Sequence, residues 1–244
     1  MTEPTTLFRA EWGSRAYGTN NEHSDRDIIQ VVIERPEHIT GLSEFKAKNT
    51  STAATGERST SEDTDTVIYG LQKYAGLAVA GNPQVMATLF LDDFIEKSHM
   101  FNYLQNFRSA FVSKQSGKKY LGYMKSQRYN LEGLKTGRTN RPELVHTHGY
   151  DTKFAMHAAR LGYQGLELMR TGSIHLPMTG DALKVCKMIR AGEVSKDAAL
   201  TIIKDLEADL EKAVEATDLP DFGDKARVSE LLHDIYMEDW NQND

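Results

Sequence analysis

Residues 13–34 read GSRAYGTNNEHSDRDIIQVVIE, and this stretch decides the fold. Its last part, residues 27–34, is a run of β-branched side chains bounded by Pro36, which is typical of a buried strand. The preceding residues 7–12 alternate loosely between apolar and polar side chains, so they predict a second, short strand. That strand runs into Gly13-Ser14, which predicts a tight turn, and a polar loop follows.

Two features of this stretch suit phosphoryl transfer. A Gly-Ser turn lets the main chain come close to a triphosphate, because glycine has no side chain to block the approach and exposed N–H groups attract negative charge. Ser14 adds a hydroxyl donor. Asp25 and Asp27 stand two residues apart at the start of a strand, so their carboxylates project from the same face of the sheet.

Two adjacent carboxylates repel each other unless a cation lies between them, and Mg²⁺ is the hard ion that prefers such oxygens together with phosphate. A pair of such ions catalyses in-line displacement at phosphorus, and that chemistry takes a third carboxylate from a neighbouring strand. Asp65 is the first candidate for this third ligand and Asp63 is the second. Taken singly, Gly-Ser is an ordinary turn and Asp-Arg-Asp a solvated strand entrance; their order and spacing favour the functional interpretation.

The rest of the chain is predicted to become helical. Residues 46–64 are small and polar and predict a loop or open hairpin, and the apolar spacing from Val67 predicts a helix that stops at Gly81-Asn82-Pro83. Residues 86–91 predict a short strand or a helical turn. Beyond residue 98 we expect only helices, at 100–113, 116–126, 152–170, 180–191, 197–216 and 226–239. The apolar side of the last helix could pack internally or form a dimer, and its spacing does not decide between them.

One of these helices carries a second set of polar residues. Asp151 or Thr152 can cap its start, and Lys153, His157 and Arg160 then lie on one face. The two cations suit phosphate, with His157 as a hydrogen-bond donor or proton carrier. The alternative is a salt-bridged surface or a histidine packed against the core, with Glu167 one turn further neutralising the cations.

These residues resemble the signature of the DNA polymerase β nucleotidyltransferase superfamily, in which an apolar strand and Gly-Ser precede Asp-x-Asp. More narrowly, the chain resembles nucleotidyltransferases found beside RNA ligases in RNA repair operons and in phages. The shared motifs are Gly13–Gly18, Ser24–Asp27, Gly81–Pro83 and Gly149–Leu161. The chain departs from those relatives at Ile29-Gln30, where they often carry Arg-Gly, and at Ala87, near which they often carry Glu. These departures bear on substrate identity and not on the three acids.

The resemblance implies an α+β fold, with an α/β nucleotidyltransferase core and small mixed sheet at residues 1–97. A helical domain at residues 98–244 would close the nucleotide cleft. It also implies transfer of an NMP, with AMP from ATP expected first, to a hydroxyl with release of pyrophosphate. In this scheme Asp25, Asp27 and Asp65 hold Mg²⁺, or Mn²⁺ in its place, and the other site residues bind the nucleotide. Those residues are Gly13, Ser14, Arg15, Lys153, His157 and Arg160.

The charge distribution bears on the acceptor. The whole chain has a net charge of −6, but residues 108–141 contain nine Lys/Arg against the single acid Glu132, a local charge of +8. Residues 203–244 carry a charge of −9. The basic segment also contains the aromatic residues Phe111, Tyr120, Tyr123 and Tyr129, and this combination favours an RNA acceptor. Alternatively, the basic segment docks against the acidic C-terminal helices or is a solvated helix face.

The remaining expectations concern membrane insertion, cellular location and zinc binding. The chain has no stretch of the roughly 18 apolar residues that a membrane helix needs, and its start does not resemble a signal peptide. The lone cysteine, Cys186, takes an apolar helix position, so we expect a reducing, cytoplasmic location. His146-x-His148 indicates zinc only weakly, because no third ligand stands nearby.

Two other functions compete with transfer to RNA. One is the addition of AMP to a protein hydroxyl, and the other is a nucleotide-binding regulator without turnover. The intact pair Asp25 and Asp27 disfavours the regulator. The preferred base, the acceptor and the oligomeric state do not follow from the sequence.

Overall fold

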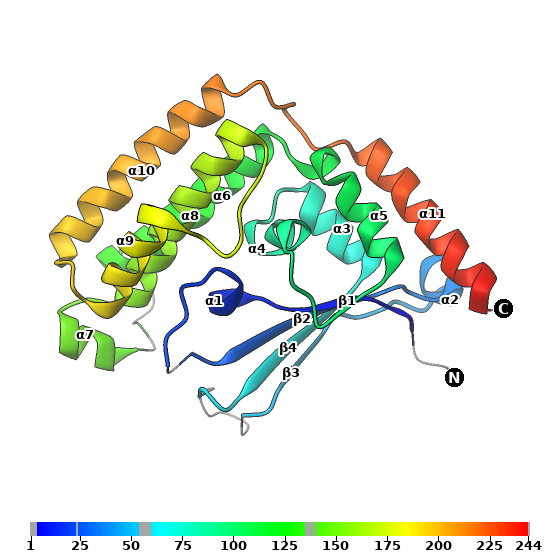
Figure 1. Ribbon diagram of the computed structural model, residues 1–244, viewed down its shortest axis with the longest axis horizontal. Helices are drawn as coiled ribbons and strands as arrows, with labels where there is room; N and C mark the ends of the chain where they lie inside the picture. The colour runs from blue at the N-terminus through cyan, green and yellow to red at the C-terminus, as the bar shows by residue number, and fades with distance from the viewer. Residues whose placement is uncertain (1–3, 23, 54–59, 135–138, 140, 244) are drawn as a thin grey trace. The chain divides into compact units, whose positions relative to one another are not determined.

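The computed structural model describes residues 4–22, 24–53, 60–134, 139 and 141–243 (Figure 1). Contacts group the chain into two compact units. The first contains Met1–Ala80, Gln84–Phe111 and Asp224–Asp244, and the second contains Gly81–Pro83 and Val112–Gly223. The last helix therefore groups with the sheet. The domain boundary after residue 97, which the sequence suggested, stays a prediction.

The first unit is built on a mixed sheet of five strands in the order β3-β4-β2-β1-β5. The strands are β1 (Thr6–Glu11), β2 (Arg26–Val32), β3 (Lys48–Ser51), β4 (Thr64–Gly70) and β5 (Glu96–Lys97). β2 and β4 pair in parallel, and the other neighbours are antiparallel. This small mixed sheet, with the helices around and after it, confirms the α+β class.

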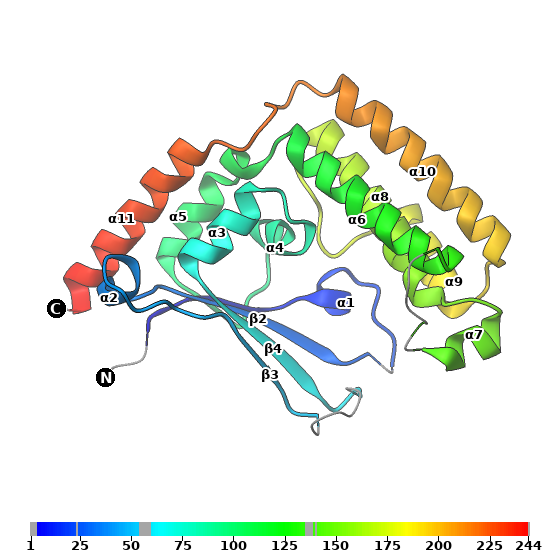
Figure 2. The same cartoon turned by 180° about the vertical axis from the view of Figure 1, so that it is seen from behind.

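Helices α3 (Leu71–Val79) and α5 (His99–Asn106) lie on the same side of this sheet in both views (Figures 1 and 2). They bury an aromatic cluster around Phe8 of β1. The ring of Phe8 lies 4.1 Å from that of Phe101 and 5.5 Å from that of Tyr74, measured between centroids. Leu71, Tyr74, Ala75 and Ala78 form the buried face of α3, as their spacing predicted.

The remaining elements of the first unit are short apart from its last helix. They are α1 (Gly13–Ala16), α2 (Pro36–Ile39), α4 (Pro83–Ala87, whose first residue belongs to the second unit), and the 3₁₀ turns η1 (Thr88–Phe90) and η2 (Arg108–Phe111). The last helix is α11 (Lys225–Asn243), which packs on α3 and η2. Its apolar side, including Leu231, Ile235 and Tyr236, is buried, so the described structure uses that side internally.

Helix α11 is tied to the end of β2 through Glu34, whose side chain is only 4% exposed. The hydroxyl of Tyr236 donates to Glu34 Oε2 at 2.6 Å, the backbone N–H of Gln72 donates to Oε1 at 3.2 Å, and Trp240 Nε1 donates to the Glu34 carbonyl at 2.9 Å. Burial, followed by the bond to Glu34, raises the pKa of Tyr236 above its ordinary value. Each buried polar group in this contact therefore has a partner.

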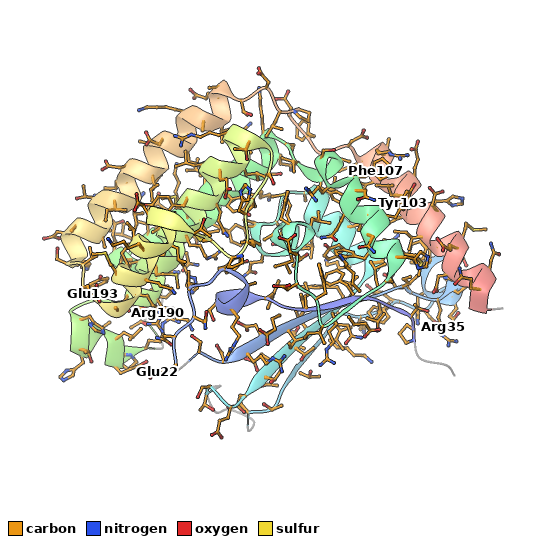
Figure 3. All side chains as sticks on the ribbon, in the orientation of Figure 1. Glu22, Arg35, Tyr103, Phe107, Arg190 and Glu193 are labelled. Atoms are coloured by element: carbon orange, nitrogen blue, oxygen red, sulfur yellow. The ribbon has the colours of Figure 1, made fainter. Side chains whose placement is uncertain are left out.

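We expect Tyr236→Phe to lower the free energy of unfolding by about 1–3 kcal/mol, because it leaves a buried carboxylate short of a donor. Urea unfolding measures this change. Tyr103→Phe is the matched control: its hydroxyl donates to Asp234 at 3.0 Å in an exposed position, so we expect a change within about 0.5 kcal/mol. Figure 3 labels Tyr103 on α5. Equal effects of the two changes would contradict a structural role for the Glu34 contact.

The second unit consists of helices packed around α8. Its members are α6 (Lys114–Glu132), α7 (Pro142–His148), α8 (Thr152–Thr171), α9 (Gly180–Ala191) and α10 (Lys196–Ala216). Helix α8 packs against each of the others, and α6 also packs against α10 (Figure 2). Gly81 allows a close approach at the start of α6, since a Cβ there would lie 2.6 Å from the Cα of Ser116.

Several sequence-based boundaries were wrong. Residues 67–70 continue β4, and the helix begins only at Leu71, because the short apolar run Val67–Tyr69 on the strand also satisfies a helical pattern. The helix expected at 100–113 ends at Asn106 and is followed by η2. Helix α7 was not predicted. Two open alternatives were decided by the structure: residues 86–90 form helical turns, and residues 48–51 and 64–70 pair as antiparallel strands, with residues 54–59 between them outside the described residues. Of the helices in the described part of the chain, none is long and apolar enough to cross a membrane.

Candidate active site

Three aspartates come together at one end of the parallel strand pair. Asp25 immediately precedes β2, Asp27 lies within it, and Asp65 lies on β4 directly opposite Asp27 in the register. Side-chain oxygens of the three residues lie within 4.8 Å of one another. All three side chains are half-buried. Because parallel neighbours present opposed residues on the same face, the register of β2 and β4 completes the predicted triad.

Gly13 lies directly against this triad. Its φ is +63°, in the left-handed region that favours glycine, and a Cβ at this position would lie 2.0 Å from Asp27 Oδ2. The N–H of Trp12 donates to the Asp27 carbonyl at 3.0 Å, which holds the turn against β2. Gly13 is therefore needed both for the shape of the turn and for the position of an acidic side chain.

Asp63, the second candidate for the third acid, is engaged elsewhere. Its carboxylate accepts hydrogen bonds from the Thr60 N–H at 2.9 Å, the Thr60 hydroxyl at 2.8 Å and the Thr52 hydroxyl at 3.0 Å. These bonds, led by that from the Thr60 backbone, lower the pKa of Asp63. Asp63 therefore stabilises the base of the β3–β4 hairpin, and Asp65 is the residue that joins Asp25 and Asp27 in space.

The residues after Gly13 form the single turn α1. Ser14 Oγ is buried and has no hydrogen-bond partner among the described residues. A buried hydroxyl without a partner is costly, so this atom is suited to a ligand. Arg15 donates to the Ser24 carbonyl at 3.4 Å and thereby connects the turn to the residue before Asp25.

A pocket of about 320 Å³ adjoins two of the acids. Asp27 and Asp65 form part of its wall, and Trp12 forms another part. The β3 residues Asn49, Thr50 and Ser51 also contribute to its lining. The lining thus combines an aromatic residue and neutral polar residues with two of the three acids.

The second unit contains the other predicted site residues. Asp151 caps α8, accepting from the N–H groups of Lys153 at 3.0 Å and Phe154 at 3.2 Å, as one of the two expected caps. Lys153, His157 and Arg160 follow on one face of α8. Burial, and then the charges of Arg160, Lys153, Arg141 and Arg190, lower the pKa of His157 well below its ordinary value. His157 is therefore neutral near pH 7.

The alternative interpretation assigned Glu167 to neutralise these cations. Its carboxylate instead accepts from His175, through the backbone N–H at 3.3 Å and through the imidazole ring. Sequence reasoning missed Arg141 and Arg190, because they come from outside α8 and have no periodic relation to it. Only the tertiary structure, in which α9 packs on α8 and Arg141 pairs with the α8 cap Asp151, brings these arginines close.

The basic segment is less available for RNA than its composition suggested. Phe111 and Tyr120 are fully buried and cannot stack on bases. Lys125 pairs with Glu211 at 2.7 Å, and Arg128 pairs with Glu207 at 2.9 Å, so part of α6 docks on acids of α10. Lys118 and Lys119 remain exposed. Lys135 and Arg138 lie outside the described residues.

Comparison with protein families classes the chain as a nucleotidyltransferase of the DNA polymerase β type. The chain belongs to RlaP, the RNA repair pathway DNA polymerase beta family, whose model matches residues 2–234. Its membership confirms the resemblance drawn from the motifs. It also supports classing the chain as a nucleotidyltransferase.

Two individual proteins are also similar. An uncharacterized 38.9 kDa protein from the nrdC-mobD intergenic region of Enterobacteria phage T4 is 29% identical over 136 residues. That match covers 52% of this chain but only 40% of the phage protein. The crystal structure of a nucleotidyltransferase-like protein from Exiguobacterium sibiricum aligns over 96% of this chain and 75% of its own. Its identity of 11% and TM-score of 0.31 are too low to support an argument.

Proposed function

We propose that the protein transfers an NMP, with AMP from ATP as the first expectation, to a hydroxyl group. The oxygen of the acceptor forms a bond to the α-phosphorus, the bond from that phosphorus to the β-phosphate oxygen breaks, and pyrophosphate and a proton are released. The observation that carries this proposal is the convergence of Asp25, Asp27 and Asp65 within 4.8 Å beside the Gly13-Ser14 turn.

The donor set fits a hard divalent cation. Three half-buried carboxylates at this separation repel one another, and their oxygens are the ligands that Mg²⁺, or Mn²⁺, prefers. Asp25, Asp27 and Asp65 would hold the metal. When bound, it would supply charge neutralisation at the reacting phosphate.

The remaining roles fall to the chain's own groups. Gly13 keeps the main chain clear of Asp27, and the buried Ser14 hydroxyl donates to a phosphate oxygen. Arg15 holds the turn to the residue before Asp25 and adds positive charge. We also propose that Lys153, His157 and Arg160 bind phosphate groups of the nucleotide. The cytoplasm is the proposed place of action, which accords with a single, buried cysteine.

RNA is the proposed acceptor, and Lys118 and Lys119 of α6 are the residues expected to contact it. We expect the double change Lys118→Gln and Lys119→Gln to weaken RNA binding about tenfold and to reduce its salt dependence. Lys125→Gln is the control, because that lysine is already paired with Glu211 and Glu207. Binding isotherms at several salt concentrations make the comparison. An identical loss for Lys125→Gln would argue against a contact surface at Lys118 and Lys119.

The direct test is incubation of the protein with each α-labelled NTP, Mg²⁺, and total RNA or cell extract. The variant Asp25→Ala/Asp27→Ala is the control. Label that enters RNA only with the intact pair supports the proposal, whereas label that enters one protein supports the protein-modifying alternative. Metal-dependent NTP binding without incorporation would favour the regulator. If the unaltered protein neither binds NTP nor incorporates label, both the transferase and the regulator are ruled out.

A further inference from the structure

One face of α8 carries four polar side chains in succession. Lys153, His157, Arg160 and Gln164 are spaced by four, three and four residues, which places them along one stripe of the helix. Two of them are almost completely covered: Arg160 is 5% exposed and Gln164 is 1% exposed. Charged and amide side chains of this kind are rarely buried unless they meet a partner of opposite polarity.

The hydrogen bonds inside this stripe leave buried nitrogen atoms without acceptors. Arg160 Nη1 donates to Gln164 Oε1 at 2.7 Å, so the amide oxygen is used by a donor. Gln164 Nε2 is buried and has no hydrogen-bond partner among the described residues, and the same holds for His157 Nδ1. An unmet buried donor is costly, and a functional ligand is one way to satisfy it.

Two arginines from other elements strengthen the positive field. Arg190 of α9, labelled in Figure 3, donates to the Thr152 hydroxyl at 3.4 Å. Arg141 lies just before α7 and pairs with Asp151, with its Nε 3.0 Å from Oδ2. The carboxylate of Asp151 also caps α8, so this acid is already engaged.

We propose that Lys153, His157, Arg160, Gln164 and Arg190 form a phosphate-binding site within the second unit, and that this site works without a divalent metal. It fits a terminal phosphate, because such a group carries more than one negative charge and several acceptor oxygens for amide, imidazole and guanidinium donors. The identity of the ligand rests on the proposed function. It is either the triphosphate of an NTP or the terminal phosphate of a nucleic acid. Arg190 and Gln164 extend the predicted phosphate contacts beyond the three residues found in the sequence.

His157 makes binding at this site sensitive to pH. In the free protein, burial and the charges of Arg160, Lys153, Arg141 and Arg190 hold its pKa well below the usual value, and it is neutral. From α9, Cys186 contributes only a neutral thiol, because burial raises its pKa to about 12. A bound anion favours the protonated ring and raises the pKa of His157. Binding therefore takes up a proton and strengthens as pH falls.

The test is calorimetric titration of the full chain with tripolyphosphate in excess EDTA. We expect saturable binding that Arg190→Gln weakens at least about tenfold, and that Gln164→Met, which keeps the volume but removes the amide, weakens several-fold. Arg170→Gln is the matched control, because Arg170 is an exposed arginine on the same helix, and we expect no change. Circular dichroism confirms that each variant is folded. Absence of saturable binding, or equal weakening by Arg170→Gln, overturns the proposal.

A second arm tests the proton. Sulfate keeps a constant charge between about pH 8 and about pH 6, so its binding reports on the protein alone. We expect its affinity to rise as pH falls for the unaltered protein and to stay flat for His157→Gln. A flat profile for both would overturn the role of His157.

A third arm separates the two sources of phosphate. ATP is compared with a short oligoribonucleotide that carries a 5′-phosphate and with the same oligomer ending in a 5′-hydroxyl, all in EDTA. If Arg190→Gln weakens the binding of ATP alone, the ligand of this site is the nucleotide. If it weakens the binding of the 5′-phosphorylated oligomer alone, the ligand is the phosphorylated end of a nucleic acid. Because EDTA removes divalent metal, the tripolyphosphate titration does not depend on the metal that Asp25, Asp27 and Asp65 would hold. Failure of NMP transfer therefore leaves this inference standing, and failure of metal-free binding leaves the transferase standing.

Discussion

Gly13→Ala is expected to lower the rate of NMP transfer at least about 100-fold, because displacement of a reacting group by about 1 Å has effects of that size. The new Cβ would lie 2.0 Å from Asp27 Oδ2, and the backbone φ of +63° is unfavourable for alanine. Asp27 must therefore move away from Asp25 and Asp65, or the turn must change shape. Steady-state kinetics with labelled NTP, together with the Mg²⁺-induced shift in melting temperature, measure both consequences.

Gly133→Ala is the matched control for the backbone term. Gly133 has a φ of +74° at the end of α6, and a Cβ there would meet nothing within 4 Å. Both substitutions carry the cost of a left-handed alanine, about 1–2 kcal/mol, but only that at Gly13 disturbs a carboxylate. A comparable loss of transfer in the two variants would mean that lowered stability, and not the displacement of Asp27, is responsible.

Asp65→Asn is expected to impair metal binding, whereas Asp63→Asn is expected to leave it largely intact. Asp65 lies with Asp25 and Asp27, so its neutralisation should remove most Mg²⁺-dependent transfer, by about 100-fold or more. Asp63 accepts hydrogen bonds from Thr60 and Thr52, so its neutralisation should destabilise the hairpin while most transfer remains. Transfer rates as a function of Mg²⁺ concentration distinguish the two residues.

Thermal unfolding adds a readout that does not depend on turnover. A metal that binds only the folded protein raises its stability by about 2.7 kcal/mol at 100 times the dissociation constant. We expect this gain for the unaltered protein and for Asp63→Asn, and little of it for Asp65→Asn. If Mg²⁺ stabilises Asp65→Asn as strongly as the unaltered protein, Asp65 is not a ligand.

Local pattern was a reliable guide where a single element carried the information. The limits of α9 agree with the prediction, because its apolar spacing and the Gly192 that ends it are both local signals. The strand at Asp27 was equally clear from its β-branched run. By contrast, Val67 was assigned to a helix, because a short run of apolar residues at the end of a strand satisfies two periodicities at once. The availability of Tyr120 was also misjudged, since composition does not distinguish a stacking aromatic from a buried one.

The sequence by itself determined those features that depend only on the backbone geometry of one strand, turn or helix. The spacing of Asp25 and Asp27, the Gly13-Ser14 turn and the single face shared by Lys153, His157 and Arg160 all follow from fixed repeats of strand and helix. Tertiary structure decided between Asp65 and Asp63 as the third acid, and it alone showed that Arg190 joins the cations of α8 and that α11 covers Glu34. The reason is physical: contacts between distant segments depend on strand register and on how helices pack, and neither is encoded in the spacing within one segment.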